Sequence, residues 1–363
     1  MISFVHTGDI HLGLHFNNVS FDREKAIARR RELWSTFERI ARYAHENHMD
    51  FLLIAGDLFE DRYFTLGDMR RVRDILGSIE DTNVLVIAGN HDYLYEKSLY
   101  NKVEWSPNVH IFRGDGLEKK EFQELNTVIY GYSWDRVEIR DSVSFEDFDL
   151  HDKGKNRILL LHGDIGSNSR YLPLDLNRLR ELDMDYIGLG HIHKPQIIDE
   201  NIAYCGCPEP LDFGEVGERG FIQGHITQDG TNIEFVPFSK RSFWDIDMIL
   251  YGDMGYGDIV DSFNDIYEGK KSRDFYRVKL TGYIQNDIDV EELFKCLSDE
   301  FYHLEILDNT VPDYDLEALE NDYSDNIIGN FIGEMKAKGL DDTKVRDALY
   351  YGLDALLKGR VNP

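Results

Sequence analysis

The chain has 363 residues, of which 42% are hydrophobic and 30% are charged, as is typical of a folded globular protein. It has no apolar run near the roughly 20 residues that a membrane-spanning helix needs, and its three cysteines do not make a disulfide framework. The N-terminus lacks the basic start of a signal peptide, so we expect a cytoplasmic protein without membrane contact. The formal net charge of −28 counts against nucleic-acid binding, unless bound divalent metals or a partner subunit supply the positive charge.

The first part of the chain alternates apolar runs with helical patterns. Continuous apolar runs at residues 2–7, 51–55 and 84–88 predict buried strands. Apolar residues at helical spacing predict helices over 24–47 and 66–79. Such an alternation indicates a parallel sheet covered by helices.

The middle of the chain is rich in short strands separated by glycine, aspartate and asparagine. The predicted strands cover residues 109–112, 127–130, 158–161, 186–189, 202–205, 220–226 and 232–237. We therefore predict an α/β fold in which two stacked sheets lie between outer helices, an α/β/β/α sandwich.

The pattern changes again near residue 240. Strands are predicted at 245–250, 275–281 and 304–307, and helices at 258–267 and 290–301 lie between them. We expect three parts: a sandwich core at 1–240, a small α+β domain at 241–310 and a helical segment at 311–363.

Residues able to bind metal ions follow the apolar runs, each beside a glycine or at the end of a strand. In chain order these residues are Asp9, His11, Asp57, Asn90, His162, His191 and His193. Because the carboxyl ends of strands in an α/β sheet meet at one edge, we expect these side chains to converge there. The neighbouring glycines let the chain turn sharply and keep the site open to a substrate.

The chemistry of these side chains points to two metal ions. Carboxylate and amide oxygens with imidazole nitrogens suit borderline divalent ions such as manganese, iron or zinc. Seven ligands are too many for one ion and fit two ions about 3.5–4 Å apart that share a carboxylate. Such a pair activates water for attack on a phosphoester. The sequence therefore predicts a two-metal phosphoesterase, with manganese as the expected ion and iron or zinc as alternatives.

The same residues stand in five blocks that resemble those of the calcineurin-like metallophosphoesterases: D-x-H, G-D, G-N-H-[DE], H and G-H-x-H. This resemblance implies how the ligands are divided: Asp9, His11 and His193 on one ion, Asn90, His162 and His191 on the other, with Asp57 bridging. The fold that it implies agrees with the predicted sandwich.

The resemblance also implies a catalytic residue beside the ions. His91 would stabilise the transition state or protonate the leaving oxygen, oriented by Asp92. Some relatives carry a second catalytic histidine where this chain has Glu60, so that role is left vacant. His15, on the loop after the first block, is a candidate contact to substrate phosphate.

Within this family the chain is similar to the nuclease subunit of the SbcCD type. The similarity rests on Asp57-Leu58-Phe59, on Tyr204-Cys205-Gly206-Cys207-Pro208-Glu209 and on Phe213-Gly214-Glu215. It implies a DNA exonuclease or endonuclease that acts at DNA ends with an SbcC-type ABC ATPase. A homodimer and a capping role for residues 241–310 are also implied. The acidic composition favours the alternative, a phosphoprotein or small-molecule phosphoesterase without a nucleic-acid role.

The sequence does not decide the roles of two further segments. The helices predicted at 326–338 and 341–357 either pack within their own domain or dock the ATPase, as the C-terminal helices of the SbcCD group do. The run Arg29-Arg30-Arg31 is expected on a solvated helix face rather than at a DNA contact.

Overall fold

The computed structural model describes residues 1–16, 22–113, 116–143, 145, 150, 152, 154–166, 169–266, 268–285 and 288–358. The chain forms two compact units, Met1–Phe243 and Trp244–Pro363. Within the described residues, no helix combines the length and apolar character needed to cross a membrane.

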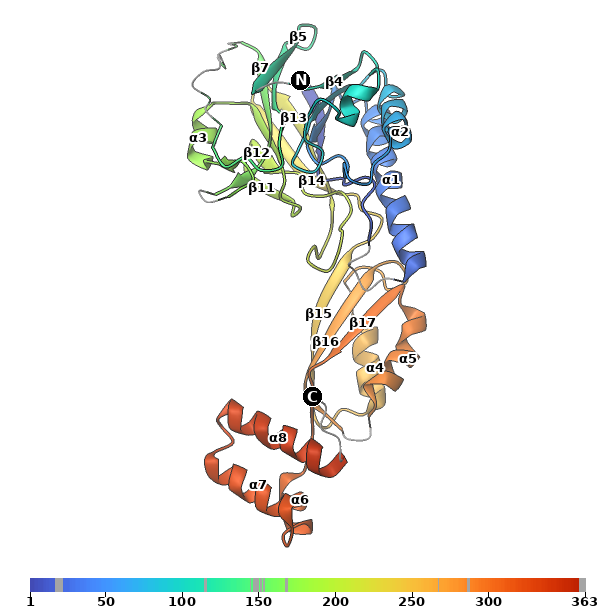
Figure 1. Ribbon diagram of the computed structural model, residues 1–363, viewed down its shortest axis with the longest axis vertical. Helices are drawn as coiled ribbons and strands as arrows, with labels where there is room; N and C mark the ends of the chain where they lie inside the picture. Colours follow the sequence, from blue (N-terminus) through green and yellow to red (C-terminus); the bar gives the residue numbers. More distant parts are fainter. Residues whose placement is uncertain are drawn as a thin grey trace. The chain divides into compact units, whose positions relative to one another are not determined.

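Two six-stranded sheets form the first unit (Figure 1). The strands of the first sheet are β1 (Ile2–Thr7), β2 (Phe51–Ala55), β3 (Asn83–Ile87), β4 (Val109–Ile111), β13 (Gly220–Thr227) and β14 (Gly230–Pro237). Their order is β14-β13-β1-β2-β3-β4, with β1 to β4 parallel and β13 antiparallel to both of its neighbours.

The second sheet has a parallel centre with an antiparallel strand at each edge. Its strands are β5 (Leu117–Phe122), β6 (Thr127–Tyr132), β7 (Asn156–His162), β10 (Tyr186–Gly190), β11 (Gln196–Asp199) and β12 (Ile202–Tyr204). The order is β11-β12-β10-β7-β6-β5, and only the edge strands β11 and β5 are antiparallel to their neighbours. A short parallel pair, β8 (Asp164–Ile165) and β9 (Pro173–Leu174), follows β7.

Helices α1 (Arg23–Glu46) and α2 (Leu66–Gly77) cover the first sheet, and the short α3 (Leu176–Glu181) lies on the outer side of the second (Figure 1). A 3₁₀ turn, η1 (Leu99–Lys102), precedes β4. The alternation along β2 explains the layers: Leu52 packs in the core under the helices, and Leu53 packs in the core between the sheets. The predicted α/β/β/α sandwich is confirmed.

The second unit contains a smaller sheet and a group of helices. Its elements are β15 (Phe243–Leu250), α4 (Tyr256–Asn264), β16 (Phe275–Ile284), α5 (Val290–Leu297), η2 (Ser298–Glu300), β17 (His303–Asp308), β18 (Val311–Pro312), α6 (Leu316–Asp322), α7 (Ile327–Lys338) and α8 (Thr343–Lys358). The predicted helix at 258–267 ends at Asn264, and Tyr267 lies outside the described residues.

Two hydrophobic clusters support this second unit. One packs α4 and α5 on the sheet, and the other holds α7 and α8 together. The structure separates the chain once, after Phe243, whereas the sequence suggested boundaries near 240 and 310. The three-part division therefore stays a prediction.

Candidate metal centre

The predicted ligands meet at the carboxyl edges of the parallel strands in both sheets. They come from the loops after β1, β2, β3 and β10 and from the end of β7: Asp9, His11, Asp57, Asn90, His162, His191 and His193. Most of them are buried, so the cluster lies at the base of the loops and not on their tips.

The first group consists of Asp9, His11 and His193. One ligand atom from each lies within 4.8 Å of the others. The Nε2 atoms of His11 and His193 face one another at 3.1 Å. The Asp9 carboxylate accepts the backbone N–H of His191 at 3.0 and 3.1 Å, which fixes its position.

The second group consists of Asp57, His162 and His191, and its ligand atoms also lie within 4.8 Å of one another. The Asn90 amide oxygen joins this group, 3.1 Å from His162 Nε2 and 3.2 Å from His191 Nδ1. Asp57 Oδ2 lies 3.3 Å from His162 Nε2 and 3.9 Å from His11 Nε2. Asp57 therefore stands between the two groups, where a shared ligand must be.

The backbone at the site adopts an unusual conformation. Asp9, His11, Asp57 and His191 all have positive φ angles, of 47°, 51°, 49° and 92°. Such angles cost an L-residue roughly 1–3 kcal/mol each and persist only where the surrounding fold imposes them. Gly89 is needed for close packing, because a Cβ there would lie 2.3 Å from Asp57 Oδ1. The fold thus gives up some stability to aim these side chains at one point.

The second nitrogen of several imidazoles is held by an outer group. His11 Nδ1 lies 2.8 Å from Glu60 Oε1, and His162 Nδ1 lies 2.8 Å from the Ala55 carbonyl oxygen. His193 Nδ1 lies 2.5 Å from Glu215 Oε1. Such contacts fix the tautomer and turn the opposite nitrogen toward the cluster, as in metal-binding histidines.

Glu215 is itself supported by the Tyr204–Glu215 segment. It accepts hydrogen bonds from the Cys207 thiol at 3.2 Å and from the Leu211 backbone N–H at 2.7 Å. The buried thiol of Cys207 therefore stabilises the carboxylate that orients His193. Sequence reasoning noted both residues as part of a family segment but did not predict this contact.

Carboxylates at the cluster favour positive charge on two of its imidazoles, whereas burial lowers the pKa of a third, His191, to about 3. Burial lowers the pKa of His162, yet the Asp57 carboxylate more than compensates and raises it to about 9. Burial also opposes protonation of His193, but Glu215 and Asp9 raise its pKa to about 9. A site that raises the pKa of buried imidazoles stabilises cations, and the donor set of carboxylate, amide and imidazole suits divalent ions. The residues present therefore fit two metal ions.

His91 lies at the open edge of the cluster, and its partner differs from the one expected. Its side chain is 44% exposed, and its Nδ1 lies 3.0 Å from Glu60 Oε2. This hydrogen bond raises the pKa of His91. Glu60 thus contacts both His11 and His91, and the position that sequence reasoning left vacant is filled by a carboxylate. Its place three residues after Asp57 was the available signal.

Asp92 does not make the contact to His91 that was expected of it. Its carboxylate accepts the backbone N–H groups of Gly89 at 2.6 Å and Leu58 at 2.8 Å. The Tyr100 hydroxyl donates to it at 2.7 Å. Asp92 therefore ties the loop after β2 to the loop after β3, while Glu60 is the residue positioned to orient His91.

His15 is not among the residues grouped at the metal centre and contacts Tyr63. Its ring stacks on Tyr63 with centroids 4.3 Å apart, and the Arg62 guanidinium lies 5.3 Å from the centroid of the Tyr63 ring. A contact between His15 and substrate phosphate stays a prediction.

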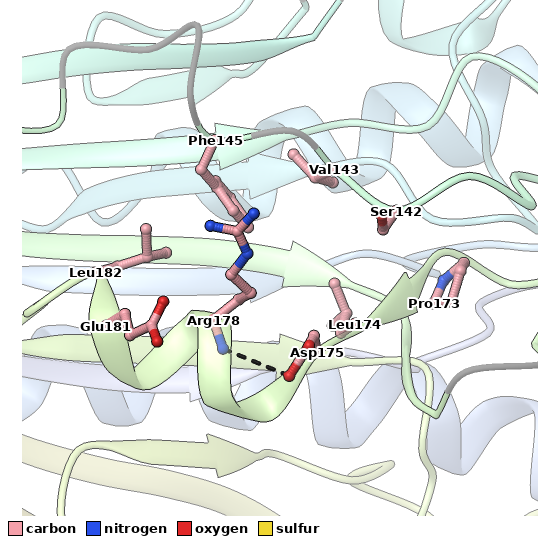
Figure 2. Close-up of a pocket in the computed structure, with 9 residues that line it drawn as sticks. All are labelled: Ser142, Val143, Phe145, Pro173, Leu174, Asp175, Arg178, Glu181 and Leu182. Atoms are coloured by element: carbon pink, nitrogen blue, oxygen red, sulfur yellow. Dashed lines mark hydrogen bonds between the residues drawn. The ribbon is translucent and has the colours of Figure 1, made fainter.

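A cavity of about 440 Å³ lies elsewhere in this unit, beside β9 and α3 (Figure 2). Its described lining includes Phe145, Leu174 and Arg178 and contains none of the predicted metal ligands. This cavity is therefore not formed by the predicted metal ligands.

A two-sheet α/β sandwich with aspartate, asparagine and histidine side chains gathered at its strand ends defines a metal-dependent phosphoesterase. Residues 2–195 match the family described as calcineurin-like phosphoesterase. This match covers more than half of the chain, which belongs to that family.

Curated relatives divide between an uncharacterised protein and DNA-repair proteins. The chain is 31% identical over 253 residues to the uncharacterized metallophosphoesterase YhaO of Bacillus subtilis (strain 168), covering 64% of this chain and 60% of YhaO. It is 26% identical over 266 residues to the DNA double-strand break repair protein Mre11 of Haloferax volcanii, covering 70% of this chain and 56% of that protein. For the DNA double-strand break repair protein Mre11 of Methanocaldococcus jannaschii, the identity is 29% over 267 residues, covering 68% of this chain and 69% of that protein. The chain thus spans less than two thirds of the length of YhaO and of the Haloferax protein.

Proposed function

We propose that this chain is a two-metal phosphodiesterase that hydrolyses the backbone of DNA near its ends. The observation that carries the proposal is the convergence of seven ligand side chains with His91 at the exposed edge of the cluster. DNA as the substrate is supported by the relatives named as DNA double-strand break repair proteins.

In this proposal Asp9, His11 and His193 hold one ion, Asn90, His162 and His191 hold the other, and Asp57 is shared. Two such ions, with manganese as the first candidate and iron or zinc as alternatives, supply an activated water and neutralise charge on the phosphate oxygens. The ligand side chains are held in place before substrate arrives by Glu60, Glu215 and the Ala55 carbonyl. This preorganisation avoids reorganisation during the reaction.

His91 acts as the proton donor to the leaving oxygen. Glu60 holds its Nδ1, leaving Nε2 to give up a proton. The same carboxylate raises the pKa of His91, which keeps the ring protonated at a higher pH than a free histidine.

The second unit supplies the surface for a partner. α7 and α8 bury Ile332, Leu349 and Leu353 against each other, while Ile327 is 69% exposed and Tyr351 is 59% exposed. The helices therefore pack within their own unit, and the exposed Ile327 and Tyr351 support the docking interpretation as a proposal. We propose an SbcC-type ABC ATPase as the partner of that face and a homodimer as the assembly.

The alternative is a phosphoprotein or small-molecule phosphoesterase with the same metal centre. The net charge of −28 favours it, because a polyanion is repelled by an acidic surface. The two functions use the same ions and the same His91, so they differ in what binds around the centre.

A metal add-back experiment separates these functions. Purified, metal-stripped protein receives manganese and is offered labelled double-stranded DNA and, separately, an aryl phosphodiester. Asp57→Asn serves as the control for contaminating nucleases. Manganese-dependent shortening of DNA that is absent in the control supports the nuclease. Hydrolysis of the aryl ester without cleavage of DNA, with or without the ATPase, would favour the alternative.

A further inference from the structure

A hollow on the helical face of the first unit combines arginines with an aromatic ring. It has a volume of about 260 Å³ and is lined by Ile27, Arg30, Arg31, Trp34 and Arg71. The first four residues belong to α1 and the last to α2. We call it the arginine hollow.

The three arginines of this hollow differ in whether their guanidinium groups have an ion-pair partner. Arg71 pairs with Glu38 at 2.6 Å and places its guanidinium 4.2 Å from the centroid of the Trp34 ring. Arg30 and Arg31 are exposed, and within the described residues neither has an ion-pair or hydrogen-bond partner. By contrast, the neighbouring Arg29 is fully buried. Two cationic groups are therefore free to bind an external anion in a chain with a net charge of −28.

The hollow is connected to the metal centre through packed aromatic rings. Trp34 stacks on Phe64 with centroids 5.9 Å apart, and Phe64 stacks on Phe59 at 4.6 Å. The backbone N–H of Phe64 donates to the Glu60 carbonyl at 3.0 Å. Glu60 in turn contacts His91. The turn from Glu60 to Phe64 thus joins a residue that contacts His91 to a ring that contacts Trp34.

The turn between these two places also carries a cation. Arg62 lies over the Tyr63 ring, and that ring stacks on His15. Two carboxylates on the same segment keep their charge: Asp61 accepts from the Tyr95 hydroxyl at 3.2 Å, and Asp68 is in the capping box of α2. Arg62 is exposed and adds a third cation on the turn that joins Glu60 to Phe64.

We propose that the arginine hollow binds the phosphodiester backbone of the DNA strand whose end lies at the metal centre. This inference rests on the proposed nuclease function and specifies where an acidic protein holds its substrate. The planar guanidinium groups of Arg30 and Arg31 match phosphate oxygens, and Trp34 supports the hollow through its contacts with Arg71 and Phe64. A small aryl phosphodiester does not extend beyond the metal centre and gains nothing from the hollow.

Charge reversal tests this assignment in the full chain. The Arg30→Glu/Arg31→Glu variant is compared with Arg42→Glu/Arg136→Glu, which changes the net charge equally at two exposed arginines outside the hollow. The Kd for a labelled 30-nucleotide DNA strand is measured by fluorescence anisotropy at several salt concentrations. Hydrolysis of the aryl phosphodiester is measured in parallel.

We expect the hollow variant to bind DNA at least 10-fold more weakly than the control variant. The slope of log Kd against log salt should fall by about 0.7 for each phosphate group that the variant no longer binds. Hydrolysis of the aryl ester should stay within twofold of wild type, which also shows that the variant is folded.

Two results would overturn the assignment. One is DNA binding equal to that of the control variant. The other is a shift from dimer to monomer in analytical ultracentrifugation with unchanged DNA affinity, which would identify the hollow as a contact between two copies of the chain. The nuclease function is judged separately, by whether wild-type protein shortens DNA with manganese. If wild-type protein does not shorten DNA, the proposed nuclease function is refuted. The comparison of DNA affinities between the two variants still decides whether the hollow binds DNA.

Discussion

Replacing Glu60 by glutamine removes one charge at the centre of the site and keeps the shape of the side chain. In the native chain the two carboxylate oxygens contact different rings, Oε1 at 2.8 Å from His11 and Oε2 at 3.0 Å from His91. Glutamine can still accept one hydrogen bond through its carbonyl oxygen. Its amide nitrogen cannot accept a second, so protonated His91 no longer has an acceptor for its Nδ1–H.

The size of the effect follows from that single hydrogen bond. A hydrogen bond to a charged group contributes about 1.5–3 kcal/mol, which corresponds to about 10- to 150-fold. If the bond acts when His91 protonates the leaving oxygen, the loss should fall on kcat. KM should change little, because Glu60 is largely covered by the two histidines and is not placed to bind substrate.

The assay is steady-state hydrolysis of an aryl phosphodiester with saturating manganese, together with metal analysis of the dialysed protein. Glu138→Gln is the matched control, since Glu138 pairs with Arg140 on the surface. A fall in kcat with both ions retained supports the orienting role toward His91. A fall that accompanies loss of one ion assigns the effect to His11 instead. A Glu60→Gln enzyme with wild-type kcat and full metal content would refute the reasoning.

Three further outcomes are expected. His91→Ala should keep both ions by metal analysis and lose about 10²–10⁴-fold in kcat, the usual contribution of a general acid; turnover at the wild-type rate would contradict its role. Burial lowers the pKa of His6 to about 3, so the unfolded chain binds more protons below pH 6.5 and native stability falls as the pH drops. Between pH 8 and pH 5 this residue should cost about 2 kcal/mol, and denaturant unfolding of His6→Gln should lack that loss. Arg29→Met should lower the free energy of unfolding by about 3–5 kcal/mol, because it leaves the buried Glu209 without its cation, whereas Glu32 keeps its pair with Arg241; a loss under 1 kcal/mol would show that Glu209 finds another partner.

The sequence was sufficient to predict where the ligands meet. Parallel strands bring their carboxyl ends to one edge, so Asp9, Asp57 and Asn90 had to be neighbours once three buried strands were recognised. The imidazoles from the second sheet, such as His162, joined them because the two sheets stack with their strand ends on the same side. The apolar runs and their order along the chain were enough to predict this convergence, because it follows from the topology of parallel strands.

The outer contacts of the site could not be predicted in the same way. Glu60 and Glu215 reach their histidines from loops, where side-chain direction follows no period. The family resemblance implied that Asp92 orients His91, but the Asp92 carboxylate accepts the backbone N–H groups of Gly89 and Leu58 instead. Sequence order identifies which residues are available, and only the folded loops decide which of them touch.

The burial of individual residues on a helix was also hard to predict from the sequence. The run Arg29-Arg30-Arg31 was expected to be solvated, yet Arg29 is fully buried and pairs with Glu32 and Glu209. Successive residues on a helix point about 100° apart, so one member of such a run turns inward. Strand β5, with the sequence Leu-Glu-Lys-Lys-Glu-Phe, was not predicted because it is charged, as edge strands often are.

The acidic composition does not by itself decide between DNA and a small phosphoester. Net charge is a sum over the whole molecule, but at physiological ionic strength exposed charges act over only about 8 Å. In the proposed function, the groups that a DNA strand would meet are the ions of the candidate metal centre and the exposed arginines Arg62, Arg30 and Arg31. Carboxylates farther away repel the strand weakly and would instead oppose binding along other faces. If the arginine hollow binds the strand as proposed, the affinity for DNA would depend on these few arginines and little on the net charge.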